Sequence, residues 1–307
     1  MSRHYGTLFN PAAVAMSVIL ACWTTADAQE IYVTPKIATL DTSLMGWWKL
    51  DEKSGTTASD SSSCGNHGKL INYPTRVGGR IGGALHFANT DDTRIYVEIP
   101  NSPTLENVQE EDYTVAAWVW PSSLPPGTEV TPAFSILVKE GYHIGLVYDQ
   151  DGLYKMQHHS SVGYSLAKSA KKSPGAWHHV TGVVSKSNGF VKIYVNGKIE
   201  ATVNFSPGAS AREFGMVTWK LGIAGPGYTK FREAMSGKID DARVYNRVLS
   251  DAEIAALAHV VNATPAIDSG ANADAHTALK TKSAKFPLGE HGKTPEKAEA
   301  PEQTAIQ

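Results

Sequence analysis

The sequence predicts an all-β fold in which antiparallel strands form a sandwich or a barrel. Short runs rich in aromatic and β-branched residues fill most of the stretch from residue 45 to 260. Turn signals such as Asn196-Gly197 separate these runs, and no helical pattern is interleaved between them. Strands that follow one another through short turns are typical of sandwiches and barrels.

The strands are expected in a definite order along the chain. The run at 113–120 is apolar on both faces, as in a central strand. The stretch 191–203 alternates around Asn196-Gly197, the dipeptide that favours a type I′ hairpin turn. Together with 177–185 it predicts a three-stranded meander. The other expected strands are 134–138, 144–148 and 153–156. The residues predicted to be buried are Trp47, Leu85, Phe87, Trp118, Val180, Ile193 and Val195.

One short helix is expected at the C-terminal end of this region. Ser250 and Glu253 form a capping box, in which each side chain pairs with the backbone N–H of the other residue. Ile254 and Leu257 then supply a short apolar face.

The N-terminus has the features of a secretory signal. The apolar run 12–23 is too short to span a bilayer, and Ala26-Asp27-Ala28 is a small-x-small cleavage pattern. We therefore expect a signal peptide at 1–28, a leader at 29–44, and a secreted, periplasmic or cell-surface protein without a transmembrane segment. Lipoprotein anchoring through Cys22 is the alternative.

The remaining composition sets further limits. Of 307 residues, 42% are hydrophobic and 19% are charged, and the net charge of −2 gives no basic stripe for nucleic acid. Residues 261–307 are poor in aromatic side chains, which predicts a disordered tail. Once a signal peptide is removed, Cys64 has no disulfide partner; a structural thiol and a nucleophile both remain open for it.

Several segments, taken together and in order, resemble the LamG-like jelly-roll family of the concanavalin A-like lectin and glucanase superfamily. They are residues 46–52, 60–68, 79–87, 113–118, 177–180, 193–197, 237–245 and 249–254. The resemblance spans 45–260 and implies a two-sheet antiparallel jelly-roll sandwich. The resemblance says less about function, because members of the family serve as carbohydrate-binding or as protein-binding modules on the same fold.

Catalysis is not supported by the motifs. The glucanases of this superfamily carry two acidic residues on one face of a strand, in the pattern Glu-x-Asp-x-Glu. The nearest acidic run, 110–112, precedes a strand instead of lying within one. A Gly-x-Ser-x-Gly nucleophile turn is also missing from the sequence. We therefore predict a non-enzyme, with a glycoside hydrolase or lyase as the weaker alternative.

The favoured function is binding of a polysaccharide or extracellular glycan through aromatic side chains that stack on sugar rings. The candidate ligand-binding residues are Tyr142, Tyr148, Tyr154, His158, Tyr164, Trp219 and Tyr228. The binding surface is expected on the concave face of the sandwich or in loops such as 121–133, 157–173 and 224–236. Ordinary core packing is the alternative for each ring, and a protein-interaction or envelope-structural module is the alternative function.

A structural Ca²⁺ is the metal that the sequence favours. The resemblance places such an ion between the first and last strands, and the candidate ligands are Asp51, Asp60, Asp240 and Asp241. Salt bridges, such as one from Arg243 to Asp241, and turn caps are the alternative. The run 149–152 is similar to the start of an EF-hand loop, but Ser160 occupies the twelfth position, so it predicts a turn.

Overall fold

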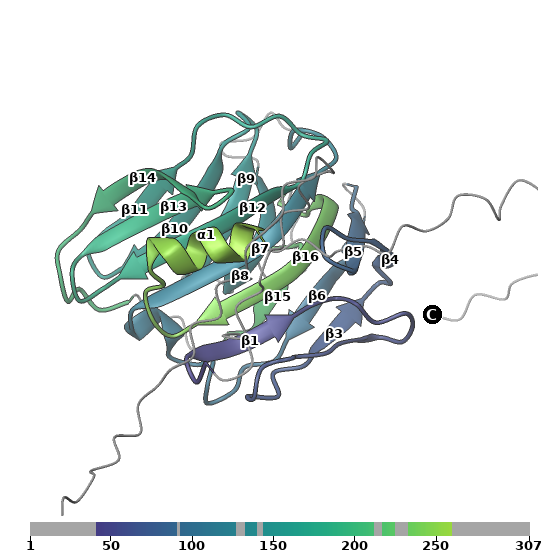
Figure 1. Ribbon diagram of the computed structural model, residues 1–307, viewed down its shortest axis with the longest axis horizontal. Helices are drawn as coiled ribbons and strands as arrows, with labels where there is room; N and C mark the ends of the chain where they lie inside the picture. Colours follow the sequence, from purple (N-terminus) through teal and green to yellow (C-terminus); the bar gives the residue numbers. More distant parts are fainter. Residues whose placement is uncertain are drawn as a thin grey trace, which may run out of the picture. The chain divides into compact units, whose positions relative to one another are not determined.

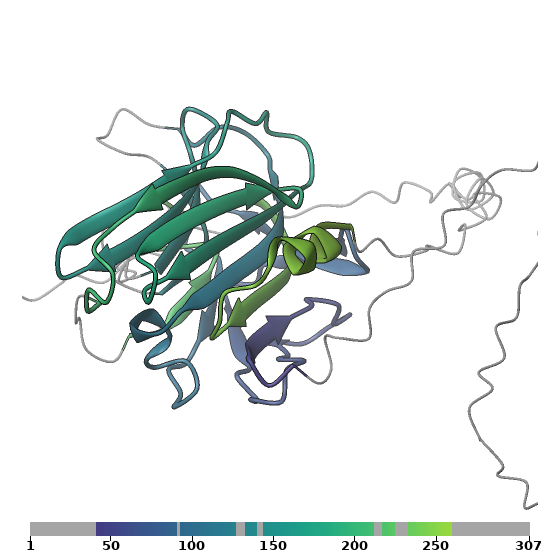
Figure 2. The ribbon, with the colours of Figure 1, turned by 60° about the vertical axis from the view of Figure 1, so that its left-hand side comes forward.

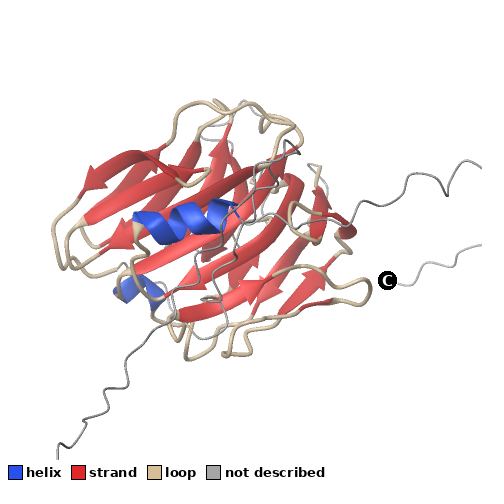
Figure 3. Ribbon diagram, viewed as in Figure 1, coloured by secondary structure: helices blue, strands red, loops and turns tan. Residues whose placement is uncertain are grey.

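The computed structural model describes residues 41–90, 93–126, 133–139, 144–211, 217–224 and 233–259. All of them belong to one compact unit, and strands dominate it (Figures 1 and 3). The strands form two antiparallel eight-stranded sheets, which confirms the predicted sandwich. The predicted signal peptide, Cys22 and the predicted tail lie outside the described residues.

Strand order defines the two sheets. The first sheet runs β14 (Lys198–Asn204), β13 (Phe190–Val195), β12 (His178–Ser185), β7 (Tyr113–Pro121), β16 (Ser236–Tyr245), β5 (Gly83–Ala88) and β4 (Thr75–Gly78), and β1 (Leu44–Trp48) also pairs with β16. The second sheet runs β11 (Gly163–Lys168), β10 (Tyr154–Ser160), β9 (Ile144–Asp149), β8 (Ala133–Lys139), β15 (Trp219–Leu221), β6 (Tyr96–Ile99), β3 (Gly68–Ile71) and β2 (Thr57–Ala58). A short 3₁₀ helix, η2 (Val108–Glu110), precedes β7.

The inward side chains of both sheets form one apolar core. From β7 it receives Val115, Ala117 and Val119, which alternate with outward residues along the strand. The predicted core residues Leu85, Phe87, Val180, Ile193 and Val195 all belong to it.

Two predicted core tryptophans are placed differently. Trp48 enters the core, whereas its neighbour Trp47 packs partly buried on the opposite side of the first sheet. Trp118 is buried but points away from the core, because it lies one residue from the inward Ala117 and Val119. The prediction that Trp118 is buried is therefore confirmed, although its ring lies outside the sandwich core, whereas Trp47 is only partly buried.

The predicted meander is present as β12, β13 and β14. Asn196 and Gly197 both have positive φ, 50° and 77°, as the type I′ turn requires. A Cβ atom on Gly197 would lie 2.9 Å from Cα of Ala255. The hairpin turn thus rests against helix α1 (Asp251–His259) and leaves no space for a side chain.

Helix α1 lies against the outer side of the first sheet (Figures 1 and 2). Ile254 of the helix packs with Val183, Tyr194 and Tyr245 in a second apolar cluster. This contact explains why outward residues of β12 and β13 are buried.

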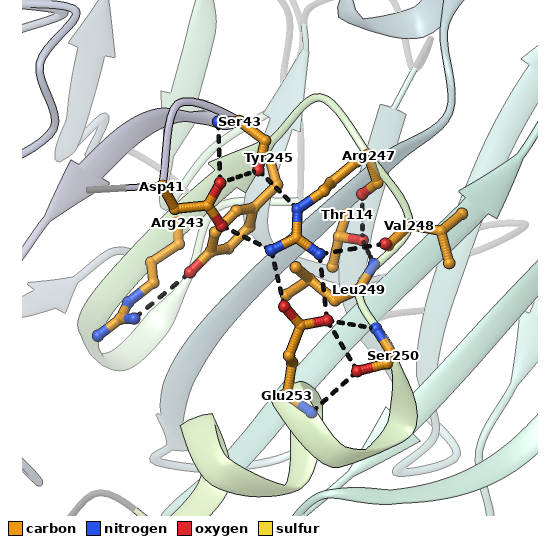
Figure 4. A network of polar contacts seen from close by, with 10 residues as sticks. All are labelled: Asp41, Ser43, Thr114, Arg243, Tyr245, Arg247, Val248, Leu249, Ser250 and Glu253. Atoms are coloured by element: carbon orange, nitrogen blue, oxygen red, sulfur yellow. Dashed lines mark hydrogen bonds and ion pairs between the residues drawn. The ribbon is translucent and has the colours of Figure 1, made fainter. Parts of the chain in front are cut away.

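Polar contacts fix the start of this helix and join it to the first described residues (Figure 4). The capping box is confirmed: Ser250 N donates to Glu253 Oε2 at 2.8 Å, and Glu253 N donates to Ser250 Oγ at 3.3 Å. Arg247 donates to both Asp41 (2.6 Å) and Glu253 (2.8 Å). The hydrogen bonds that Glu253 accepts, above all those from Arg247 and also those from Ser250, lower its pKa to about 2.

Candidate functional site

Four of the predicted ligand-binding side chains lie inside the sandwich. Tyr148, Tyr154, His158 and Trp219 have no exposed surface and belong to, or contact, the core. A ring in this position offers no face to a sugar, so their prediction as surface ligands is wrong. Tyr142 and Tyr228 lie outside the described residues.

The buried polar groups of this set have partners within the protein. Tyr148 Oη donates to the carbonyl of Lys172 at 2.8 Å, and Trp219 Nε1 donates to the carbonyl of Leu105 at 3.3 Å. Nδ1 of His158 lies 3.0 Å from the hydroxyl of Tyr113. These contacts show that the side chains have a structural role in the core.

Tyr164 is different, because 62% of its surface is exposed. It lies on the edge strand β11, directly opposite His159 of β10. The two rings stack with centroids 3.8 Å apart and an interplanar angle of 17°. His159 is itself buried, so it fixes the tyrosine ring as a flat, open surface.

Polar side chains continue this surface along the two strands. The register pairs Gln157 with Leu166 and Lys155 with Lys168, on the same side of the sheet as His159 and Tyr164. We call these six residues the Tyr164 face. Gln157 also lies over Gly145 of β9, where a Cβ would come within 3.1 Å of the amide oxygen of Gln157. The missing side chain at Gly145 therefore makes room for Gln157 to lie across the neighbouring strand.

The acidic residues split into two groups. Asp60 accepts hydrogen bonds from Trp47 N and Ser62 N at Oδ1, and from Ser62 Oγ and Asn66 N at Oδ2, all within 2.7–2.8 Å. Asp241 forms an ion pair with Arg243 at 2.9 Å and accepts from Trp47 Nε1. Their oxygens serve protein donors, so the four-residue calcium set is not assembled as predicted.

The carboxylates of Asp51 and Asp240 instead both accept hydrogen bonds from the backbone around the turn between β4 and β5. Asp51 Oδ1 accepts from Gly83 N at 2.5 Å, and Asp240 Oδ2 accepts from Ile81 N at 2.8 Å. Asp240 Oδ1 is buried and has no hydrogen-bond partner among the described residues. Burial, together with the charges of Asp241 and Asp51, raises the pKa of Asp240 to about 8.

A β-bulge in β16 explains why Asp240 and Asp241, which are adjacent in sequence, are both buried on the outer side of the first sheet. The register of β16 against β7 shifts between Asp240 and Arg243, and Asp241 has a φ of 50°. Strict alternation, which would have turned one carboxylate into the core, therefore fails here. The predicted pair of Asp241 with Arg243 is present.

Two other acidic stretches have structural roles. Asp149 accepts from the backbone of Asp151 and Leu153 and pairs with Lys155 at 2.6 Å, which confirms a turn at 149–152. Glu110, from the run nearest to a catalytic motif, pairs with Lys186 at 2.7 Å.

In the described ranges, no group of three or more His, Cys, Asp or Glu side chains is arranged to hold a metal ion. Among the same residues, no helix has the length and hydropathy needed to cross a membrane.

Solved structures share this fold at low sequence identity. Domain 4 of AbnA, a GH43 extracellular arabinanase from Geobacillus stearothermophilus in complex with arabinotriose, is 20% identical, with a TM-score of 0.52 over 70% of this chain and 98% of that one. The binding domain of Paraclostridial Mosquitocidal Protein 1 is 12% identical, with a TM-score of 0.55 over 70% and 52%. Trypanosoma rangeli sialidase in complex with sialic acid is 17% identical, with a TM-score of 0.51 over 70% and 32%.

The sialidase match concerns only a part of that enzyme, because this chain covers about a third of its length. Among curated proteins, none matches the chain in sequence. A family model for the concanavalin A-like lectin/glucanases superfamily matches residues 91–255, which is more than half of the chain. The chain therefore belongs to the concanavalin A-like lectin/glucanases superfamily.

Proposed function

We propose that this domain is a non-catalytic carbohydrate-binding module of an exported protein, and that it binds glycan on the Tyr164 face. The observation that carries the proposal is the open ring of Tyr164, held flat by its stack on buried His159. Aromatic rings present a large apolar surface at low cost in conformational entropy, which suits the C–H face of a sugar.

The neighbouring side chains supply hydrogen-bond chemistry for sugar hydroxyls. The amide of Gln157 both donates and accepts, and Lys168 is exposed on the adjacent strand. The acidic group nearest to this face along β9 and β10 is Asp149, which is paired with Lys155. This supports binding over hydrolysis, because hydrolysis uses two free carboxylates. The arabinotriose complex of a domain with the same fold adds support at the level of the fold alone.

The test is affinity electrophoresis of the full chain in gels that contain arabinan, xylan or dextran. We expect one of these neutral polysaccharides to retard the wild-type protein. The variant Tyr164→Ala should bind about fivefold more weakly, since one ring stack is worth about 1 kcal/mol.

Tyr73→Ala is the matched control. Tyr73 is 83% exposed, at the turn between β3 and β4, and lies outside the Tyr164 face. The variant Tyr73→Ala should bind the polysaccharide as strongly as the wild type. Equal binding by Tyr164→Ala and the wild type would refute the proposed site.

The alternative is a protein-interaction module, and one observation favours it. Val162, at the turn of the same hairpin, is 63% exposed beside Tyr164. Exposed apolar groups that adjoin in this way are typical of protein contacts. Failure of all three polysaccharides to retard the wild type would favour this function.

We also propose a structural Ca²⁺ between Asp51 and Asp240. The buried, unpartnered Oδ1 of Asp240 fits a cation, and Asp51 brings a second carboxylate to the same β4–β5 turn. Calcium takes carboxylate oxygens together with backbone carbonyls, which such a turn supplies. The ion would neutralise two carboxylates and hold the turn against the sheet.

Thermal melting tests the calcium site. With calcium at a hundredfold excess over its Kd, we expect the wild-type Tm to lie about 5–10 °C above its value in chelator. Asp51→Asn should remove this difference. Asp149→Asn, in the turn that is similar to an EF-hand start, should keep it. The same Tm for the wild type with calcium and with chelator would contradict the proposal.

A further inference from the structure

The outer side of the first sheet carries a row of polar and aromatic side chains that no role above explains. The register aligns Thr75 with His86, His86 with Lys238, and Lys238 with Trp120, across β4, β5, β16 and β7. All four side chains are exposed or half-buried. We call this row the Trp120 strip.

Two cations on this side of the sheet lie over indole rings and have no carboxylate partner among the described residues. Lys238 Nζ is 4.7 Å from the ring centroid of Trp120, and the guanidinium of Arg80 is 5.1 Å from that of Trp118. Within the described ranges, neither cation makes an ion pair, although the whole chain has a net charge of −2. Their charges are therefore available to a ligand.

Arg243, another cation of this sheet, gives an example of a cation–indole contact with a purely structural role. Arg243 lies 4.4 Å from the ring centroid of Trp47, but Asp241 pairs with it and both charged groups are buried. Charge compensation is complete there. Lys238 and Arg80 have no such ion pair within the part of the chain that the structure describes.

Further polar groups adjoin the strip. Nε1 of Trp118, in the next row of β7, is buried without a hydrogen-bond partner among the described residues. Two residues along the chain from Trp120 and Lys238, the exposed hydroxyls of Ser122 and Ser236 lie 2.7 Å apart, and Ser122 Oγ also donates to the carbonyl of Ser236. Neutral hydroxyls, an indole edge and free cations thus meet within one area of the sheet.

We infer that the Trp120 strip is a second binding site, and that its ligand is an acidic sugar, a pyranose that carries a carboxylate. Lysine and arginine form charge-assisted hydrogen bonds with a carboxylate. The indole of Trp120 packs against the apolar C–H groups of the ring, and the serine hydroxyls bond to its hydroxyls. A nucleic acid would need a broader basic surface than two cations provide.

The site is independent of the Tyr164 face, because it lies on the opposite sheet. Its test is affinity electrophoresis of the full chain in gels with polygalacturonate, compared with pectin of the same backbone whose carboxylates are methyl-esterified. Chelator is present throughout, so that calcium does not bridge protein and polymer. We expect retardation by polygalacturonate and at least fivefold less by the ester.

The variants Trp120→Ala and Lys238→Gln should each weaken polygalacturonate binding about tenfold or more. Lys192→Gln is the matched control, because Lys192 lies 4.6 Å from the ring centroid of Phe190 on the same sheet and its loss removes the same charge. Lys192→Gln and Tyr164→Ala should bind polygalacturonate like the wild type.

Each contrary result overturns the inference. Equal losses in Lys238→Gln and Lys192→Gln would mean that overall charge, and not the strip, binds the polymer. Equal retardation by the ester would exclude carboxylate recognition. Loss of polygalacturonate binding in Tyr164→Ala alone would place the acidic sugar on the other sheet, and no retardation of the wild type would remove the site.

Discussion

Replacing Gly197 by valine is expected to lower the free energy of unfolding by about 3 kcal/mol. Two effects add. A β-branched residue is strained at the φ of 77° that the hairpin turn needs. Its Cβ would also meet Cα of Ala255 at 2.9 Å, which forces the turn away from helix α1. Denaturant unfolding with circular dichroism measures the loss.

Gly208→Val separates the two effects. Gly208 has a similar φ of 73°, but a Cβ there meets no atom within 4 Å. This variant carries only the backbone strain, and we expect a loss of about 1–2 kcal/mol. If both variants lose the same amount, contact with the helix contributes nothing, and the close packing of the turn on α1 is refuted.

Asp60→Ala is expected to be at least as damaging, with a loss of about 4 kcal/mol. The carboxylate holds the segment after β1 together by accepting from Trp47 N, Ser62 N, Ser62 Oγ and Asn66 N. Alanine leaves the buried N–H of Asn66 and the partly buried N–H groups of Trp47 and Ser62 without this acceptor, and a buried donor without a partner costs about 1–3 kcal/mol. Thermal and urea unfolding measure the effect.

Asp112→Ala is the control for Asp60. Asp112 also accepts several hydrogen bonds, from Ser185 Oγ and from Ser187 N and Oγ, but those at Ser187 are exposed to solvent. Water replaces the lost acceptor there, so the free energy of unfolding should fall by about 1 kcal/mol or less. The loss in Asp60→Ala should be the same with calcium and with chelator. A loss that appears only with calcium would make Asp60 a metal ligand after all.

The elements that the sequence predicts correctly are those with local causes. Asn196-Gly197 fixes its turn by the φ values that these two residues accept, and Ser250 with Glu253 fixes the first turn of α1. The central position of β7 follows from its apolar residues on both faces. None of these depends on contacts far away in the chain.

The candidate site was harder to predict because it depends on which face of each strand points outward. In β10, the inward residues Tyr154, Met156 and His158 alternate with the outward Lys155, Gln157 and His159. A signal was present: Lys155 and Gln157 are polar and mark the outer face. This alternation of polar residues points to His159 as the outward histidine, and not to the predicted His158.

The acidic residues show a second limit. Alternation along 236–245 predicts opposite faces for Asp240 and Asp241, but the bulge breaks the count. Such a bulge depends on the pairing of β16 with β7, which lie more than a hundred residues apart. The hydrogen bonds that Asp60 accepts from backbone N–H groups likewise depend on the folded loop, so the local sequence did not predict them.

The pairing of β16 also has a consequence for the kinetics of folding. In the first sheet, β16 lies between β7 and β5 and pairs with β1 as well, although it is the last strand of the domain. The β1–β5 half of this sheet therefore stays unjoined until residues 236–245 dock. Contacts at such sequence separation slow folding, because long loops must close first. We expect a chain that stops before β16 to collapse without forming the first sheet, and its exposed edges at β7 and β5 to favour aggregation.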